Sequence, residues 1–303
     1  MTDFTGRVDI EQNPRLQNLD GVSNIVILYG VVNIQDNDTL MNLDALSSMR
    51  SINGLLRING NSNLLNINGL SNISNLIGAI SIRNNPELNN IDALSGLDSL
   101  LGWIWIIDNV SLSDIDGLNN IESIGEFGRL EISKNNALAN VDGFSNLDSI
   151  AGQLRISENQ GLVDLKGLSA LTKVGERGLE LLGNSQLAAC CELLPILLDE
   201  DNIVTIENNN FGCASVEEII DACTVSTNDH HLESVQVYPN PVIGQLTISA
   251  QAPTEYSILS GNGTFVLQNG LLKEGDNIIE MGTLESGLYI VKVGNDNLRI
   301  LKL

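Results

Sequence analysis

Few side chains in this 303-residue chain could do chemistry, and four cysteines are the most concentrated of them. Cys190, Cys191, Cys213 and Cys223 lie in one segment, and no other cysteine occurs. We predict two disulfides and hence an oxidising compartment. Zinc binding is the alternative, but adjacent cysteines lack the two-residue gap of a zinc knuckle and no histidine interleaves. The pairing stays open, although adjacent cysteines rarely bond each other, which favours pairing each of the first two with one of the last two.

The chain contains too few histidines to support histidine-dependent catalysis over most of its length. The only histidines are the adjacent His230 and His231, in a short polar segment at residues 224–234 that we interpret as a linker. A Ser-His-Asp or Cys-His arrangement is therefore not available in the rest of the chain. We expect no catalytic residue and no bound metal, and we predict that the protein is not an enzyme.

Carboxylates recur at one position of a repeated motif. They are Asp20, Asp44, Asp92, Asp116 and Asp142, and the series is interrupted by Asn68 and Lys166. Each Asp precedes Gly or Ala and then an apolar residue, which is typical of an Asx-turn or a helix N-cap. Stacked carboxylates could instead hold Ca²⁺, which is the only cofactor that the sequence leaves open.

Composition excludes several classes of protein. The formal net charge of −23, from 38 acidic and 15 basic side chains, repels phosphate backbones and argues against a nucleic-acid partner. No apolar run reaches the roughly 18 residues that a transmembrane helix requires. Hydrophobic residues make up 43% of the chain but aromatic residues only 4%, so the core must be aliphatic.

The elements that position these residues follow from an internal repeat of about 24 residues. A four-residue motif with an apolar second position begins at residues 18, 42, 66, 90, 114, 140 and 164. A short stretch in which alternate residues are apolar follows it, which is typical of a strand with one buried face. The expected inward pairs are Val32 and Ile34, Leu56 and Ile58, Ile80 and Ile82, Ile104 and Ile106, Leu130 and Ile132, Leu154 and Ile156, and Leu179 and Leu181. We predict coils that stack into one core and a parallel sheet.

An asparagine follows each of these strands at a fixed distance. The series is Asn37, Asn61, Asn85, Asn109, Asn135, Asn159 and Asn184. The chain must turn sharply there and leaves backbone groups unpaired, which a stacked Asn can hydrogen-bond together with its neighbouring Asn side chains. We expect this Asn ladder to be structural rather than to bind a ligand.

These patterns divide the chain into solenoid repeats at residues 1–187, a disulfide-stapled cap at 188–223, the linker at 224–234 and a tail at 235–303. In the cap we expect a helix at 188–198, a last strand with its Asn at 203–209, and a helix that begins after the N-cap residue Ser215. Residues 6–16 match only the second half of a repeat, and the first residues lack the features of a signal peptide. We therefore expect an N-terminal region, signal included, to be missing.

The pattern L-x-I-x-x-N-x-x-L resembles leucine-rich repeats, and the whole unit over residues 6–223 is more similar to receptor L-domains and their bacterial relatives. This resemblance implies a right-handed solenoid with a long parallel sheet on each face, whose coils bind proteins or glycans and carry no catalysis. The expected fold class is mainly β: a right-handed leucine-rich-repeat-like solenoid followed by a small antiparallel β-sandwich.

The tail consists of short apolar stretches separated by Gly and Asn turns, which indicates that sandwich. It opens with YPNP at residues 238–241, contains SGLYIVKV at 286–293 and ends in a basic strand. These motifs resemble the type A C-terminal sorting domain of type IX secretion. The resemblance implies that residues 235–303 engage the type IX secretion machinery and that the protein is secreted or held at the outer-membrane cell surface.

Outward residues of the strands are free of packing constraints and report function best. Both tryptophans, Trp103 and Trp105, lie on this outer side, with Ile107 next in line. The surrounding outward residues are Arg57, Ser81, Arg83, Arg129, Glu131 and Arg155. An exposed aromatic pair ringed by polar groups is a platform for a sugar ring or a protein hot spot. The alternatives are that another segment or partner covers it, or that it has no role.

The functional hypothesis is a secreted or cell-surface recognition or adhesion protein that binds an extracellular protein or glycan. One alternative is a structural surface spacer without a specific ligand. The other is that the solenoid is the accessory module of a larger, truncated enzyme.

Overall fold

The computed structural model describes residues 2–125, 128–199, 201–224, 235–240, 242–260, 266–284, 287–294 and 296–302. The chain divides into two compact units, residues 1–224 and 225–303. Residues 225–234 of the expected linker, with His230 and His231, lie outside the described residues. No helix in the described part of the chain combines the length and the apolar character that a membrane span requires.

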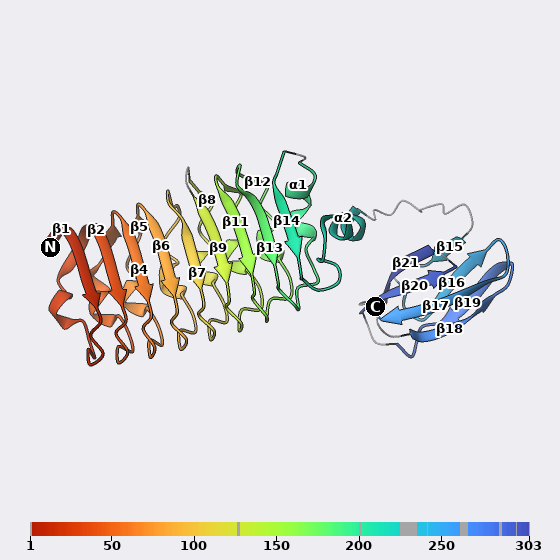
Figure 1. Cartoon of the computed structure of the whole chain (residues 1–303), viewed down its shortest axis with the longest axis horizontal. Helices are drawn as coiled ribbons and strands as arrows, with labels where there is room; N and C mark the ends of the chain where they lie inside the picture. The colour runs from red at the N-terminus through yellow and green to blue at the C-terminus, as the bar shows by residue number, and fades with distance from the viewer. Residues whose placement is uncertain are drawn as a thin grey trace. The chain divides into compact units, whose positions relative to one another are not determined.

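The first unit is a β-solenoid with one long strand of a broad parallel sheet in each coil (Figure 1). The long strands of this broad sheet are β1 (Thr2–Glu11), β2 (Ile25–Gln35), β4 (Leu55–Asn59), β6 (Ala79–Arg83), β7 (Ile104–Ile107), β9 (Arg129–Ser133), β11 (Gln153–Ser157), β13 (Gly178–Leu182) and β14 (Val204–Glu207). Neighbouring strands pair in the register of the repeat, so that Ile58 lies beside Ile82 and Ile82 beside Ile106. The predicted fold class is confirmed.

The apolar side of each strand faces a continuous aliphatic core. All the predicted inward pairs, from Val32 and Ile34 to Leu179 and Leu181, are buried. The core continues under the loops through leucines such as Leu40, Leu64 and Leu88. A fully buried aliphatic side chain contributes roughly 1.5–3 kcal/mol, so each coil adds several such increments by stacking on its neighbour.

The adjacent side of the coils carries strands of only two residues. There β3 (Ser51–Ile52) and β5 (Asn75–Leu76) continue the broad sheet from β2, while β8 (Ser123–Ile124), β10 (Ser149–Ile150) and β12 (Lys173–Val174) form a separate three-stranded parallel sheet. The expectation of a long sheet on each face is therefore wrong for this side. At the corner that follows, a Cβ on Gly78 would lie 1.9 Å from the carbonyl oxygen of Gly54, so the coils meet there backbone to backbone. This corner ends each short strand.

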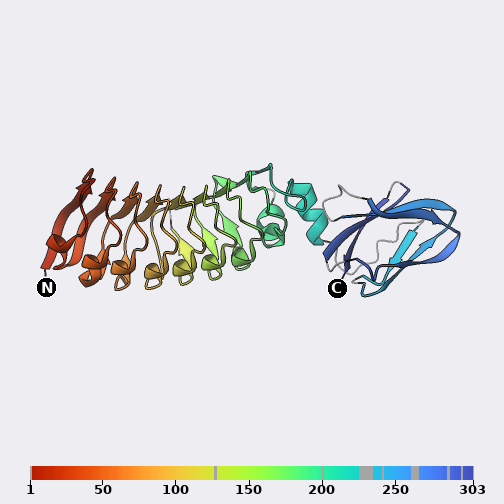
Figure 2. The same ribbon diagram turned by 90° about the horizontal axis from the view of Figure 1, so that it is seen from below.

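The remaining side carries single 3-10 turns that stack in a row (Figure 2). They are η1 (Asp20–Val22), η2 (Asp44–Ser48), η3 (Asn68–Leu70), η4 (Asp92–Leu94), η5 (Asp116–Leu118), η6 (Asp142–Phe144) and η7 (Lys166–Leu168). The Asp column therefore occupies the first position of each turn, and no Asp side chain caps it. The Asx acceptor is instead the residue two positions earlier: Asn42 Oδ1 accepts from the Asp44 N–H at 3.1 Å. The cap interpretation of the Asp column is wrong.

The Asn ladder runs along the corner after the broad sheet and is buried. Each side-chain oxygen accepts the backbone N–H and the side-chain amide of the Asn one coil earlier, as between Asn85 and Asn61 at 3.1 and 3.2 Å. The same Asn61 amide also donates to a strand carbonyl, that of Ile34, at 3.0 Å. The ladder extends by one residue at each end, to Asn13 and Asn209.

The C-terminal end of the core is covered by short helices and two disulfides. The helices are η8 (Cys191–Leu193), α1 (Leu194–Leu197) and α2 (Val216–Thr224). Cys190 bonds Cys213 and Cys191 bonds Cys223, which confirms the predicted disulfides and selects one cross-pairing. Ser215 Oγ accepts the Glu218 N–H at 3.1 Å, as expected for the N-cap of α2.

The second unit is a small antiparallel β-sandwich. One sheet contains β15 (Val235–Tyr238), β16 (Gln245–Ala250) and β19 (Gly275–Glu280). The other contains β18 (Val266–Leu272), β17 (Thr254–Ser260), β20 (Gly287–Val293) and β21 (Asp296–Lys302). Leu246, Ile248, Ile258 and Val291 are buried between them, as the alternation in the sequence indicates.

Candidate binding face

The candidate site is the outer face of the broad sheet between β4 and β13. Trp105 lies on β7, in register with Ser81 on β6 and with Glu131 on β9. Trp103 immediately precedes β7 and, like Trp105, is half-buried. Because side chains alternate between the two sides of a strand, Ile104 and Ile106 enter the core while the tryptophans stay outside. The structure thus brings the predicted residues to one surface.

The two indoles stack on each other rather than lying open to solvent. Their ring centres are 3.8 Å apart, with an angle of 26° between the planes. The Arg83 guanidinium lies over Trp105, with its central carbon 4.1 Å from the ring centre. Two groups this close to one ring centre cannot share a face, so Trp103 and Arg83 cover opposite faces of Trp105. We call this arrangement the indole stack.

This geometry corrects the expectation of an open aromatic platform. Trp105 has no free face for a sugar ring, and Trp103 has only the face that points away from its partner. The outward side chains are also less exposed than the sequence suggests. Ser81 keeps only 3% of its surface exposed, because larger side chains on the neighbouring strand crowd it. Ser81 is therefore a spacer beneath the site and not a contact residue.

Several N–H donors in the indole stack and on the neighbouring strand β9 have no acceptor. Trp105 Nε1, Arg83 Nε and Arg129 Nε are buried and lack a hydrogen-bond partner among the described residues. Burial lowers the pKa of the Arg83 guanidinium from its ordinary value, Glu131 opposes this change, and the like charges of Arg57 and Arg129 add to it. The face thus contains a partly desolvated cation that the protein itself only partly compensates.

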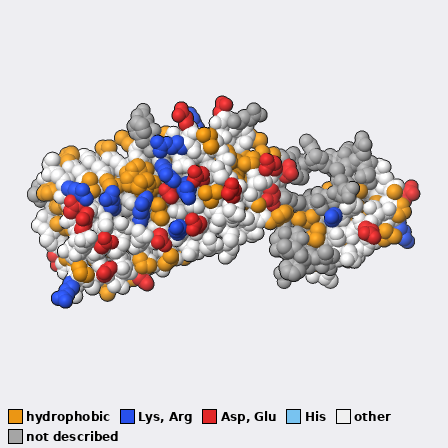
Figure 3. All heavy atoms as spheres, in the orientation of Figure 1, with side chains coloured by type: hydrophobic (Ala, Val, Ile, Leu, Met, Phe, Trp, Pro, Cys, Tyr) orange, Lys and Arg blue, Asp and Glu red, His pale blue; other side chains and the backbone are white. Residues whose placement is uncertain are grey.

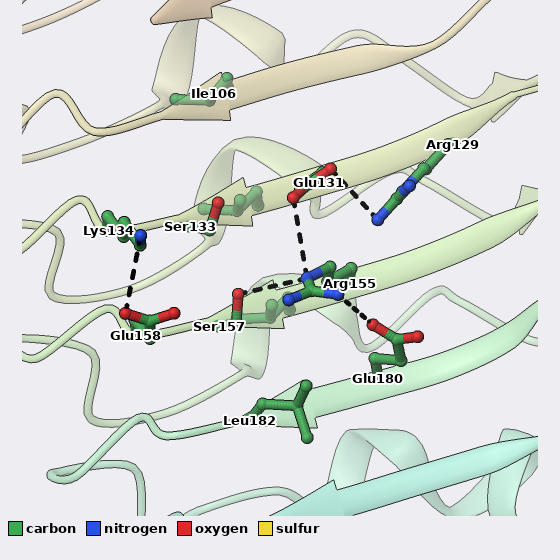
Figure 4. A network of polar contacts seen from close by, with 12 residues as sticks. Ile106, Arg129, Glu131, Ser133, Lys134, Arg155, Ser157, Glu158, Glu180 and Leu182 are labelled. Atoms are coloured by element: carbon green, nitrogen blue, oxygen red, sulfur yellow. Dashed lines mark hydrogen bonds and ion pairs between the residues drawn. The ribbon is translucent and has the colours of Figure 1, made fainter. Parts of the chain in front are cut away.

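On the far side of the indole stack, the charges compensate each other in a chain of ion pairs (Figure 4). Glu131 lies 3.2 Å from the Arg129 guanidinium and 3.7 Å from Arg155. Arg155 in turn donates to Glu180 at 2.6 Å. Glu131 is the most buried member of this chain, so it fixes the two arginines. Arg129 and Arg155 are therefore less available to a ligand than the sequence alone suggests.

Arg57 and Arg83 behave differently. Arg57 lies on β4 in register with Ser81, and Arg83 lies on β6 in register with Ile107. Within the described part of the chain, neither guanidinium is in an ion pair. Figure 3 shows hydrophobic side chains gathered between Lys and Arg side chains on this side of the first unit. We call Arg57 and Arg83 the arginine pair.

Two exposed apolar residues that the sequence did not single out lie at the corner beside this face. Leu101 is two residues before Trp103 and is 65% exposed, and Ile77 occupies the same position one coil earlier at 48%. The sequence gives only a weak indication of this apolar surface, because the equivalent position in the coil before Ile77 is the polar Asn53. They extend the apolar surface next to the indole stack.

The Asp column lies on the 3-10 turns and has its own electrostatics. Burial raises the pKa of Asp116, and the charges of Asp114 and Asp142 raise it further. The pKa of Asp92 is raised by burial and by Asp114 and Asp116. No cluster of three or more His, Cys, Asp or Glu side chains in the described residues is arranged to hold a metal ion. The Ca²⁺ alternative stays a prediction, testable by thermal unfolding with and without Ca²⁺.

Comparison with known families decides the nature of the tail. Residues 236–302 match the family model of the secretion system C-terminal sorting domain. The tail is a sorting domain. Its sandwich fold and its match agree with the motifs in the sequence, and a sorting domain of this type points to type IX secretion and to release or attachment at the cell surface. The sorting domain also implies contact with the secretion machinery.

The first unit has no such match. No leucine-rich-repeat or receptor L-domain family model matches the chain. No curated protein and no solved structure matches it either. The parallel solenoid is therefore established by its own geometry, and its relation to receptor L-domains is a proposal.

Proposed function

We propose that the protein is an extracellular recognition or adhesion protein, exported by its sorting domain, that binds a ligand through the outer face of the solenoid sheet. The relation of residues 6–223 to receptor L-domains is part of this proposal. The single observation that carries it is the indole stack: both tryptophans of the protein stand on one surface beside arginines.

Trp and Arg are the residue types that dominate binding hot spots, because they combine a large contact area with directed hydrogen bonds. A solenoid strand that serves only the fold needs small or polar residues on its outer side, as Ser133 and Ser157 provide. Placing two indoles there exposes apolar surface to water without adding to the core. A ligand that covers this surface supplies the missing stabilisation.

The proposal includes no catalysis. The outer face carries aromatic, aliphatic, ionic and hydroxyl side chains but no histidine or cysteine, so it lacks the usual base for activating a nucleophile. A repeated sheet face is instead suited to an extended ligand, which crosses several coils and contacts each one in the same manner.

The test compares Trp103→Ala and Trp105→Ala with Tyr29→Ala, an exposed aromatic residue of β2. Each full-length variant is screened on a glycan array and in pull-downs from the native cell surface, after circular dichroism shows that the fold is retained. We expect the two Trp variants to lose binding and the Tyr variant to keep it. Unchanged binding in both Trp variants would contradict the proposal and favour a surface spacer, which the rigid Asn ladder also suits.

A further inference from the structure

The arginine pair lacks counter-ions in a protein that is rich in them. The chain has 38 acidic and 15 basic side chains, yet Arg57 and Arg83 form no ion pair among the described residues. Two coils away, Glu131 and Glu180 neutralise Arg129 and Arg155. On the outer face between β4 and β13, the arginines that form no ion pair with a described residue therefore lie on the β4 and β6 side of the indole stack, where Glu131 compensates Arg83 only in part.

Between β6 and β9, the buried polar side-chain atoms on this face that lack a partner among the described residues are donors, whereas Asn33 Oδ1, an acceptor, lies on β2 beside Arg57. Arg83 Nε, Trp105 Nε1 and Arg129 Nε are all donors. These three atoms are buried, whereas the Arg57 and Arg83 side chains are partly exposed, so the N–H groups of those two guanidiniums are the donors that a ligand can reach. A peptide strand brings donors and acceptors in equal number, whereas an ionised sugar acid offers carboxylate, ring and hydroxyl oxygens. The face therefore fits an acceptor-rich ligand better than a peptide.

We propose that this face binds an acidic polysaccharide, with uronate carboxylates paired to Arg57 and Arg83 and the apolar face of one sugar ring on the free face of Trp103. This inference rests on the proposed function and names its ligand class. Arg57 and Arg83 come from adjacent strands, which are about 4.8 Å apart in a sheet. A polymer that carries a charge on successive sugars presents carboxylates that two neighbouring coils can bind together.

The overall charge of −23 does not oppose this binding at short range. Charges more than about 8 Å away are largely screened at physiological ionic strength. The Asp column lies on the 3-10 turns, on a different side of the coils from the broad sheet (Figure 2). A carboxylate at the arginine pair therefore interacts mainly with these two cations. The acidic remainder of the surface lowers the association rate more than the final affinity.

The experiment uses the full-length protein and three uronate polymers: polygalacturonate, alginate and hyaluronate. Fully methyl-esterified polygalacturonate is the neutral match, poly-glutamate is the peptide match, and single-stranded DNA tests plain polyanion binding. Because Trp103 and Trp105 are the only tryptophans, their fluorescence reports occupancy directly. Biolayer interferometry gives the affinity independently.

The variants are Arg57→Gln combined with Arg83→Gln, and a control that removes the same charge elsewhere, Arg15→Gln combined with Arg50→Gln. Arg15 and Arg50 are exposed and lie outside the strands of the broad sheet. We expect at least one uronate polymer to bind and to shift the Trp emission. Charge-assisted hydrogen bonds are worth about 1.5–3 kcal/mol, so the first variant should bind about tenfold or more weakly and the control should bind normally.

Four results would overturn the inference. They are no binding to any uronate polymer, equal binding to the methyl ester, binding to DNA as tight as to the uronates, and tighter binding to poly-glutamate. In each case, loss of a different ligand by Trp103→Ala still supports the proposed function. If Trp103→Ala and Trp105→Ala lose no ligand of any kind, the proposed function itself fails.

Discussion

Asn109 donates twice to Asn135 Oδ1, from its backbone N–H at 3.1 Å and from its side-chain amide at 3.3 Å. The same amide donates to Ile82 O at 3.0 Å, so one side chain joins three successive coils. Each bond lies in the buried corner of the solenoid, where water cannot replace it. The Asn ladder therefore sets the stacking of the coils as directly as the aliphatic core does.

Replacing Asn109 with Ala should be severely destabilising. It removes the side-chain amide, while the backbone N–H stays, and it takes the Asn109 partner from the buried N–H of Asn85 and from the carbonyl of Ile82, which costs on the order of 3–5 kcal/mol. Asn13→Ala at the exposed end of the ladder should cost about 1 kcal/mol or less. Urea unfolding monitored by circular dichroism measures both. An equal loss of unfolding free energy in both variants would show that the buried Asn residues of the ladder contribute no more than the exposed Asn at its end.

The two disulfides should contribute unequally to stability. Cys190 and Cys213 are buried, whereas Cys191 is exposed. Replacing Cys191 and Cys223 with Ala should remove about 3 kcal/mol of cross-link stabilisation. Replacing Cys190 and Cys213 should cost more, since core packing is lost as well. Thermal unfolding and limited proteolysis of residues 188–224 would reveal the order. The opposite order would contradict this assignment of the buried pair.

Asp116 should make the first unit more stable in mild acid than at neutral pH. Its pKa is raised in the folded protein, first by burial and then by Asp114 and Asp142, so the folded state takes up the proton more readily than the unfolded state. Its unfavourable contribution therefore declines as pH falls through the raised pKa, and is gone below the ordinary value of 3.8.

The variant Asp116→Asn should accordingly raise the unfolding temperature at pH 7 and reduce its rise toward acid pH. The gain should stay below about 1 kcal/mol, since the carboxylate is exposed. Asp3→Asn, on β1, removes the same charge without these neighbours and should change stability less. Differential scanning calorimetry between pH 4 and pH 7 distinguishes the two. A drop in unfolding temperature for Asp116→Asn would refute the repulsion.

The stacked indoles should give a spectroscopic signature. Two indoles 3.8 Å apart couple their electronic transitions, which produces a paired positive and negative band in the circular dichroism spectrum. We expect the band to vanish in Trp103→Phe and in Trp105→Phe and to persist in Tyr29→Phe. A band that survives in either Trp variant would show that the rings do not stack in solution.

Glu131 should weaken ligand binding by neutralising Arg129 and Arg155 on the binding face. In Glu131→Gln, Arg129 loses its carboxylate and Arg155 keeps only Glu180, so binding of a uronate polymer should tighten several-fold. Stability should fall by about 1–2 kcal/mol, because this carboxylate is largely buried between two cations. Glu158→Gln is the control: its pair with Lys134 is exposed and 3.9 Å long, so little should change. Weaker uronate binding in Glu131→Gln would contradict the proposed ligand class.

Most of the architecture could be predicted from the order of residues. The alternation around Ile58, Ile82 and Ile106 identified the inner side of the broad sheet, and these residues are buried. The cysteines, clustered where the repeat fades, indicated the stapled cap. Such features are local or periodic, so they can be read without knowing what lies beside each strand. The sorting domain was recognisable for the same reason, since its motifs follow one another along the chain.

The candidate site was less predictable. The sequence placed Trp103 and Trp105 outside, but it could not show that they stack, that Arg83 closes the second face of Trp105, or that Ser81 is buried. It also assigned the Asx acceptor to the Asp column, whereas Asn42 and its equivalents two positions earlier accept the bond. Both cases depend on which side-chain rotamer or turn type is the most stable locally, and several rotamers and turn types are compatible with the same sequence.

The sequence by itself determined the period of the coils, the inner and outer sides of the strands, the presence of the disulfides and the sorting domain. Those properties follow from where apolar residues, asparagines and cysteines recur along one chain. Only the tertiary structure decided the short strands on the adjacent side, the cysteine pairing, the closed indole stack and the absence of an ion pair at Arg57 and Arg83 among the described residues. All but the contact between Trp103 and Trp105 depend on residues more than 20 positions apart, whose geometry is fixed only once neighbouring coils pack together, and the stacking of the two indoles depends on their rotamers.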